Sequence, residues 1–280
     1  AADASKFHAT LGNVVSGEEN SVTATATGAA YNDKNVAAAS KVTYTGLTLT
    51  GTGAGNYVLN RTSLAGIGTI TRRALTLGAV AAQTKTYDGN TLADASKFHA
   101  ALNNVVAGEE NSVKATATGA AYNDKNVAAA NTVNYTGVQL TGTGAGNYTL
   151  AATTAQGAGA ITPRALTLGA VAQQTKTYDG TRAADAAAFR ATLDNVVAGE
   201  ENSVTATAAG AAYNDKTVAA ANVVNYTGLA LTGTGAGNYA IADTAQGAGT
   251  ITKRALTLGE VTAQTKTYDG TTAADASKFR

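Results

Sequence analysis

Acidic side chains are the first residues in this sequence whose types and spacing could support chemistry. Glu109 and Glu110 are adjacent, and Asp88 and Asp124 lie on either side of them in the chain. Two carboxylates across a cleft would suit glycoside hydrolysis, and oxygen ligands at alternating positions would suit Ca²⁺. The pattern Asp-x-Asp-x-Asp-Gly does not occur, and neighbouring side chains tend to point apart. The sequence therefore predicts no catalytic residue, no metal site and no enzymatic activity.

Histidines and a glycine-rich loop are the remaining candidates. His8 and His99 occupy equivalent places in two repeated stretches, but a third stretch has Arg190 there and contains no histidine. A histidine site common to the repeats is therefore excluded. The loop Gly142-Thr-Gly-Ala-Gly could be mistaken for a dinucleotide-binding turn, which must open a helix to hold a phosphate. The residues after it favour a strand, so we expect a flexible turn and no cofactor.

The stretches that hold these residues recur along the chain. The string Arg-Ala-Leu-Thr-Leu begins at Arg73, Arg164 and Arg254, which gives offsets of 91 and 90 residues. Four segments are predicted: an N-terminally truncated repeat at 1–72, complete repeats at 73–163 and 164–253, and the first strands and half helix of a further repeat at 254–280. We expect 1–72 to be the less stable full-size piece. We expect 254–280 to be frayed, or to donate its strands to a neighbouring chain.

Composition limits the classes of function. The 280 residues contain no Cys, which excludes disulfides, thiolate zinc sites and cysteine nucleophiles. Lys plus Arg number 20 and Asp plus Glu number 19, and neither complete repeat has a basic face. Nucleic acid and anionic membranes are therefore not expected partners. No apolar run approaches the roughly 18 residues of a spanning helix, and no secretion signal is found within the chain.

The aromatic residues recur in strict register. All 12 Tyr occupy four repeat-equivalent positions, and all four Phe occupy one more. In the repeat 73–163 the tyrosines are Tyr87, Tyr122, Tyr135 and Tyr148. Exposed rings could stack against a sugar, but tyrosine is also the natural large core residue of a chain without Trp or Met. We favour core positions and expect one small packed core in each repeat.

Local patterns within 73–163 predict a mostly β module with one helix. Strands are expected at 74–78, 84–87, 112–118, 132–141, 148–150 and 159–162. The period changes from two to helical spacing over four apolar residues, Phe98, Leu102, Val105 and Val106. This spacing predicts a short helix from Ala93 to Gly108, although its Val-Val end could instead begin a strand. At Gly137 the strand alternation changes phase, which predicts a β-bulge.

Four motifs carry a resemblance to a known family. They are Lys85-Thr-Tyr-Asp-Gly-Asn-Thr, Tyr122-Asn-Asp-Lys-Asn-Val, Tyr135-Thr-Gly-Val-Gln-Leu-Thr-Gly with Ala145-Gly-Asn-Tyr-Thr-Leu, and Ile161-Thr-Pro-Arg-Ala-Leu. Their order and spacing resemble the YDG/MBG ("mostly β-grasp") tandem repeats of large bacterial surface proteins. Those proteins are mainly haemagglutinin-like adhesins exported by two-partner secretion. The resemblance implies β-grasp-like α+β modules, each a small sheet with one short helix, and no catalytic residues.

The resemblance and the joints between repeats together predict a function. Ile-Thr-X-Arg joins the repeats without a Gly/Ser-rich linker, which favours a semi-stiff extended rod. We expect an extracellular, non-enzymatic stalk of a bacterial cell-surface adhesin, whose partners are adjacent repeats of the same chain. The alternative is a multivalent module that weakly binds glycans or like chains and contributes to adhesion or biofilm formation. Lys85 and its counterparts near Asn-rich turns also permit intramolecular Lys–Asn amide bonds.

Overall fold

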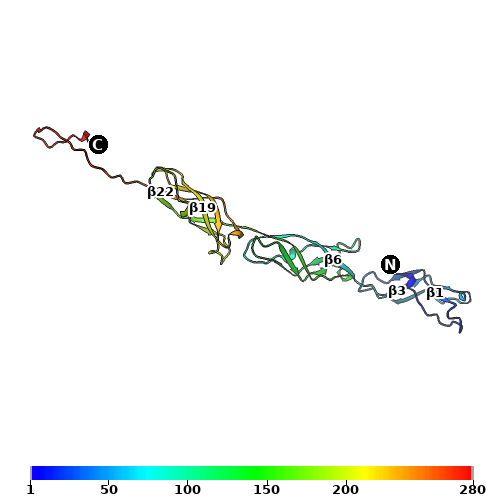
Figure 1. The fold of residues 1–280 in the computed structure, drawn as a ribbon. Helices are drawn as coiled ribbons and strands as arrows, with labels where there is room; N and C mark the ends of the chain where they lie inside the picture. The colour runs from blue at the N-terminus through cyan, green and yellow to red at the C-terminus, as the bar shows by residue number, and fades with distance from the viewer. Residues whose placement is uncertain (1, 279–280) are drawn as a thin grey trace. The chain divides into compact units, whose positions relative to one another are not determined.

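The computed structural model describes residues 2–278 and is mostly β. The chain divides into two compact units, Ala1–Thr162 and Pro163–Arg280 (Figure 1). Every helical segment within the described residues is a 3-10 helix of three residues. None of the helices in this described part has the length and apolar character that a membrane span requires.

The repeat 73–163 lies in the first unit except for Pro163, and it shows the architecture most fully. Its elements are β6 (Arg73–Val80), β7 (Gln83–Thr86), η3 (Ala95–Lys97), β8 (Ala100–Asn103), β9 (Lys114–Thr116), β10 (Gly119–Tyr122), β11 (Thr132–Thr136), β12 (Gln139–Thr141), η4 (Ala145–Asn147), β13 (Tyr148–Leu150) and β14 (Thr154–Thr162). One sheet has the order β10-β11-β14-β7, a second has β13-β6-β8, and β12 pairs with β9. The pairs β13–β6 and β14–β7 are parallel. Strand β6 is therefore central, with a partner on each edge.

The repeat 164–253 lies in the second unit and has longer strands. Its elements are β15 (Arg164–Ala165), β16 (Thr167–Val171), β17 (Gln174–Thr177), η5 (Ala186–Ala188), β18 (Ala191–Asp194), β19 (Thr205–Tyr213), β20 (Val223–Thr232), η6 (Ala236–Asn238), β21 (Tyr239–Ala240) and β22 (Thr244–Thr252). The main sheet has the order β17-β22-β20-β19. Strands β19 and β22 of this sheet are labelled in Figure 1. After β22 the described chain contains no strand and only η7 (Ala276–Lys278).

The first repeat contains fewer strands. Its elements are η1 (Ala4–Lys6), β1 (Thr23–Thr25), β2 (Gly28–Tyr31), β3 (Lys41–Thr45), β4 (Thr48–Thr50), η2 (Ala54–Asn56) and β5 (Ser63–Ile67). They form the sheets β2-β3-β5 and β1-β4. Residues 9–12 and 57–59 correspond to β8 and β13 of the next repeat, but here they lie in no strand. In the next repeat both segments pair with β6.

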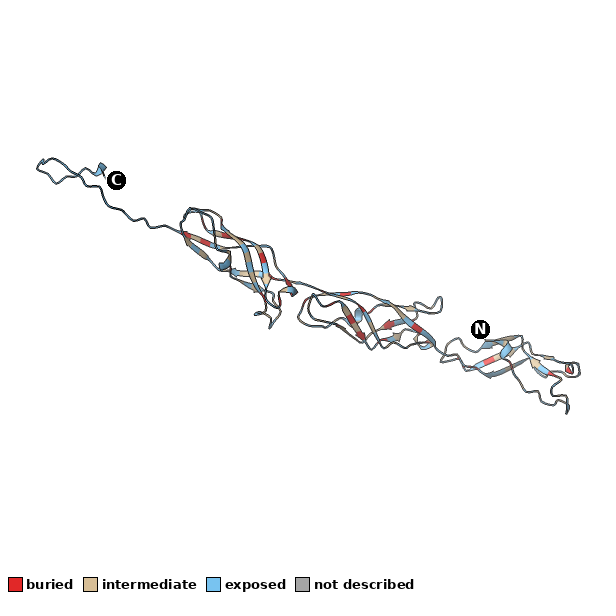
Figure 2. Cartoon of the chain, in the orientation of Figure 1, coloured by how far each residue is buried: buried red, intermediate tan, exposed pale blue. Residues whose placement is uncertain are grey.

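Aromatic packing between the strands confirms the predicted core tyrosines. Tyr87, Tyr122, Tyr135 and Tyr148 are each at most 3% exposed. Figure 2 shows buried residues on the strands of the sheets. The ring of Phe98 packs against Tyr135 with the ring centroids 4.8 Å apart. Such tilted aromatic pairs add to the free energy gained by burying the rings. Burial does not extend to every copy, because Tyr178 of the next repeat is 38% exposed.

The short helix predicted for Ala93–Gly108 is wrong. Asp94 accepts a hydrogen bond from the Ser96 amide (2.9 Å) and caps only the three-residue turn η3. The chain then forms β8, which pairs antiparallel with β6 until Asn104 takes a left-handed φ of 72°. The helical spacing gave a wrong prediction because its apolar residues pack in two different clusters. Phe98 packs on Tyr135, whereas Leu102 packs in a different cluster around Leu75.

The change of phase at Gly137 is confirmed, but the β-bulge is wrong. Thr116 pairs with Gln139, and Gly119 pairs with Thr136, so two residues on each strand separate the two ladders. No extra residue is inserted in either strand. The phase changes because Gly137 adopts φ 61°, a backbone conformation that side chains disfavour. A Cβ at this position would also overlap the Thr118 hydroxyl.

Candidate functional site

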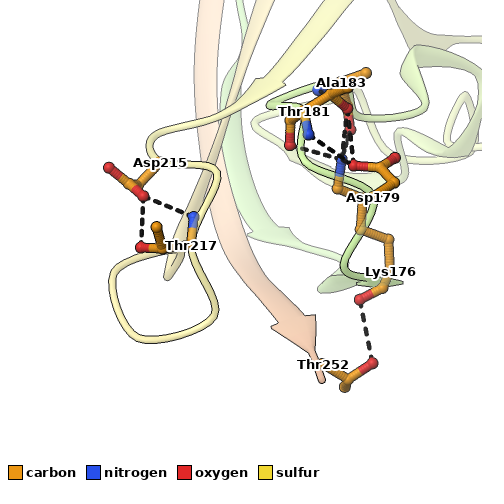
Figure 3. A network of polar contacts seen from close by, with 7 residues as sticks. All are labelled: Lys176, Asp179, Thr181, Ala183, Asp215, Thr217 and Thr252. Atoms are coloured by element: carbon orange, nitrogen blue, oxygen red, sulfur yellow. Dashed lines mark hydrogen bonds and ion pairs between the residues drawn. The ribbon is translucent and has the colours of Figure 1, made fainter. Parts of the chain in front are cut away.

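The Tyr-Asp-Gly turn holds a lysine-centred network of polar contacts (Figure 3). In the repeat 164–253, the Lys176 ammonium donates to Asp179 Oδ1 (2.9 Å), the Thr181 carbonyl (3.0 Å) and hydroxyl (3.1 Å), and the Ala183 carbonyl (2.9 Å). It also lies 5.3 Å from the centre of the Tyr213 ring, a cation–π distance. The lysine side chain is only 18% exposed. These contacts fix the chain that follows the turn.

The same network recurs in the other copies of the turn. Lys85 donates to Asp88 Oδ1 (2.6 Å) and to the Asn90 carbonyl (2.8 Å), and it lies 5.4 Å from the Tyr122 ring centre. Lys266 donates to Asp269 Oδ1 (3.0 Å). An ammonium held by carbonyl and carboxylate oxygens is satisfied as a cation. The arrangement therefore supports a turn-locking role for these lysines.

We expect the Asp179 carboxyl to titrate with an unusually low midpoint. The hydrogen bond from Lys176 and those from the Thr181 amide and hydroxyl lower the pKa of Asp179 to about 2. Because the folded pKa lies below the unfolded value near 3.8, this stabilisation is present above pH 4. It is lost as the pH falls from about 4 to 2. An NMR titration of the carboxyl carbon measures the midpoint, and Lys176→Met should raise it; an unchanged midpoint contradicts the assignment.

A Lys–Asn amide bond has suitable residue types in one turn only. Lys85 donates to the Asn90 side-chain oxygen at 3.0 Å, but Lys176 and Lys266 meet Thr181 and Thr271 at the equivalent positions. A threonine has no carboxamide that could release ammonia, so this pair of positions cannot carry an amide bond in all repeats.

We expect no such bond at Lys85 either. Lys85 Nζ is engaged in the ion pair with Asp88 (2.6 Å) and in the hydrogen bond to the Asn90 main-chain carbonyl (2.8 Å), so it is held by contacts other than the side-chain carboxamide. Intact mass spectrometry of the chain should give the mass calculated from the sequence. A mass lower by one ammonia, and restored by Asn90→Ala, would show that the bond forms.

The acids that the sequence singled out take part in separate contacts. Glu109 accepts a hydrogen bond from the Tyr148 hydroxyl (2.7 Å) and pairs with Lys34 (3.3 Å). Both contacts lower the pKa of Glu109, and the hydrogen bond from Tyr148 has the larger effect. Burial, followed by the bond to Glu109, raises the pKa of Tyr148. Glu110 is exposed, and Asp88 belongs to the lysine network, so the acids are not gathered around one cleft.

The other sequence candidates lie apart from one another. His8 and His99 are both exposed. Within residues 2–278 no three His, Cys, Asp or Glu side chains come together as a metal site. Gly142 to Gly146 leads into η4 and then directly into β13, as expected of a turn before a strand. Gly144 donates its amide to the Ser112 carbonyl (2.9 Å), so this loop is built against its own repeat.

A contact between the first two repeats is the polar cluster that sequence reasoning missed. The Asn147 side chain accepts a hydrogen bond from the Val36 amide (2.9 Å) and donates one to Asn35 Oδ1 (2.9 Å). Arg72 donates to the Gly146 carbonyl (3.2 Å). Asn35, Val36 and Asn147 are half-buried. We call these five residues the joint.

Residues around the joint reinforce it. Asp33 Oδ1 accepts from the Asn35 amide (2.6 Å) and from its side-chain nitrogen (2.9 Å), which aims the Asn35 oxygen at Asn147. The Lys34–Glu109 ion pair also crosses between the repeats, but Lys34 is 79% exposed. Exposed ion pairs contribute little to stability. The hydrogen bonds of the joint therefore determine most of its specificity.

A sequence signal for the joint existed in the two loops that form it. Asn-Asp-Lys-Asn-Val occurs unchanged at 32–36 and 123–127, and Gly-Ala-Gly-Asn-Tyr occurs unchanged at 53–57, 144–148 and 235–239. A solvent-exposed turn needs only residues that tolerate its backbone. Identity of whole loops indicates contacts made by their side chains, although the sequence does not say which loops meet.

Comparison with known proteins agrees with the repeat pattern. The family model described as the YDG domain matches residues 1–64, 71–155 and 162–246. A search of curated proteins gave no match. The three matched stretches cover most of the chain, and those at 71–155 and 162–246 contain the Tyr-Asp-Gly turns described above. The chain therefore belongs to the YDG domain family, as a tandem array of its repeats.

Proposed function

We propose that this chain is a non-enzymatic spacer, a stalk segment of a large bacterial cell-surface adhesin that holds a binding domain away from the cell. The observation that carries the proposal is the joint between the first two repeats. A flexible linker would let neighbouring modules reorient, whereas side-chain and backbone hydrogen bonds restrict their relative motion. Resistance to bending is the property that a stalk requires.

The chemistry of the described residues supports the same proposal. The lysines and acids that could have formed a reactive site are satisfied within turns, as the Lys176–Asp179 and Glu109–Tyr148 pairs illustrate. Under this proposal the repeats are β-grasp-like modules arranged as an extended rod at the cell surface. The adjacent repeats of the same chain are the main partners of each module.

A multivalent binding role is the second candidate, since repeats of this kind suit a binding region. A sugar-stacking face made of tyrosines has little support, because the four tyrosines of the repeat 73–163 are buried. Binding of the chain to a glycan array, lost when the chain is unfolded, would promote this candidate over the spacer.

Solution scattering tests the spacer directly. A compact particle of 280 residues would have a radius of gyration of about 19 Å, whereas a rod on the order of 100 Å long would have about 30 Å. We expect the larger value when data are extrapolated to zero concentration. A value near 19 Å would reject the extended arrangement.

Asn147→Ala should loosen the joint without unfolding either repeat. The variant removes two hydrogen bonds between the repeats, each of which contributes about 0.5–1.5 kcal/mol. Open arrangements should become about 5- to 150-fold more populated. Spin labels on cysteines introduced at exposed Thr52 and Thr149 would report this as a broader distance distribution.

The matched control is Asn56→Ala. Asn56 occupies the equivalent turn of the first repeat and is exposed. Its replacement should leave the distance distribution as narrow as in the parent chain. Equal broadening by both variants, or none by Asn147→Ala, would show that the joint does not restrict the repeats.

A further inference from the structure

Parallel strand pairs join the beginning and the end of the repeats 73–163 and 164–253. In the repeat 73–163, β6 pairs parallel with β13 and β7 pairs parallel with β14. The repeat 164–253 has the same two ladders, between β15 and β21 and between β17 and β22. The first strand of every pair comes from the start of its repeat, and the second comes from the end. We call these four pairs the terminal ladders.

Tension along the chain loads the terminal ladders in shear. In the repeat 164–253, a pull on the chain before β15 draws β15 and β17 toward their amino ends. A pull on the chain after β22 draws β21 and β22 toward their carboxyl ends. Because the paired strands are parallel, the two pulls act in opposite directions along the strands, while the hydrogen bonds run between them. The bonds of a ladder must therefore break together before one strand slides past the other.

The end of the β17–β22 ladder is tied by main chain and side chain. The Tyr178 amide donates to the Thr252 carbonyl (2.9 Å), and the Thr252 hydroxyl donates to the Lys176 carbonyl (3.3 Å; Figure 3). The repeat 73–163 has both bonds at the same distances, from Tyr87 to Thr162 and from Thr162 back to β7. These bonds lie where the last strand leaves its repeat, so a pull on that strand reaches them first.

Buried side chains anchor strands of the terminal ladders against sliding. Ile251 of β22 is 1% exposed and belongs to the same cluster as Phe189. Leu75 of β6 is 3% exposed and belongs to the buried cluster of its own repeat. Thr250 and Thr252 flank Ile251, so a slip of one residue would bring a polar threonine to the buried position. Sliding is therefore opposed by side-chain packing as well as by the hydrogen bonds.

We propose that the repeats 73–163 and 164–253 bear tension along the chain, and that the terminal ladders are the elements that resist unfolding under load. This role goes beyond that of a spacer, because a module can hold two domains apart without resisting a pull. Load bearing is a property of each repeat by itself. A measurement on one repeat therefore tests it independently of the proposed spacer role.

Single-molecule pulling in two directions tests the proposal on the full chain, which has no Cys of its own. Handles attached through Pro163→Cys and Lys253→Cys, both at exposed positions, load the terminal ladders of the repeat 164–253 in shear. Handles through Thr205→Cys and Thr232→Cys, at exposed residues opposite each other, open the β19–β20 ladder from its end, one bond after another. We expect a higher rupture force in shear, although β19–β20 has more paired residues than both terminal ladders of this repeat. Equal forces, or a lower force in shear, would overturn the proposal.

A proline at position 178 tests the end of the β17–β22 ladder. Tyr178→Pro removes the amide that donates to Thr252, whereas the matched control Tyr178→Ala loses the tyrosine side chain but keeps the amide. Forced unfolding is governed by the unfolding rate. At constant force in shear, Tyr178→Pro should unfold about 2- to 12-fold faster than Tyr178→Ala, as expected for the loss of one hydrogen bond.

The pulling direction supplies the control for these two variants. With handles at positions 205 and 232, Tyr178→Pro and Tyr178→Ala should rupture at the same force, because the terminal ladders carry no load. Equal unfolding rates of the two variants in shear would contradict the assignment of load to the β17–β22 ladder. The comparison of pulling directions uses the parent sequence at position 178, so it decides the proposal even where Tyr178→Pro fails to fold.

Discussion

Phe189→Ala should lower the free energy of unfolding of the repeat 164–253 by about 3–5 kcal/mol. The Phe189 side chain is 1% exposed, and its ring meets Tyr226 at 4.7 Å with the planes 60° apart. Val224 and Ile251 belong to the same buried cluster, so truncation leaves a cavity against the main sheet. The free energy of unfolding of a module of about 90 residues is only about 5–13 kcal/mol, so the variant should lose a large fraction of its stability.

Urea unfolding followed by the near-ultraviolet circular dichroism of tyrosine measures this effect. Phe189→Leu keeps most of the apolar volume and should lower the free energy of unfolding much less. Val218→Ala changes a residue that is 37% exposed and should lower the free energy of unfolding only slightly. Phe189 lies in the second unit, so the transition of the first unit should not move. Equal shifts of all transitions would show that the units unfold together.

The strands were predictable because their patterns are local. Val133 and Tyr135 alternate with polar residues on β11, and both are buried. The tyrosine core was predictable from composition and register together. The predicted helix failed because Phe98 and Leu102 have helical spacing but belong to different clusters. That division follows from tertiary packing against β6, which local spacing does not reveal.

The joint could not be predicted in the same way. Asn147 is an ordinary turn residue until Asn35 of the preceding repeat lies beside it. The sequence shows that both loops recur, but the pairing of loops is a property of the folded unit.

Gly142→Ala should destabilise the repeat 73–163 by about 2–6 kcal/mol, because two unfavourable effects add at this position. Gly142 has φ 110°, which costs an L-residue about 1–3 kcal/mol. A Cβ there would also overlap the Ser112 carbonyl oxygen, which belongs to the backbone and can move only if the loop moves. Forcing extra volume into such a contact costs about 1–3 kcal/mol more.

Gly146→Ala is the matched control for Gly142→Ala, four residues along the same loop. Gly146 has no positive φ, and no atom lies within 4 Å of a Cβ placed there. Alanine should therefore be neutral or stabilise by up to about 1 kcal/mol, through the lower entropy of the unfolded chain. Urea denaturation of both variants gives the difference. Because the loop between the two glycines leads into Asn147, Gly142→Ala should also broaden the spin-label distances across the joint, while Gly146→Ala should not. Equal stability of the two variants would mean that the loop relaxes around the new side chain and does not hold Asn147 in place.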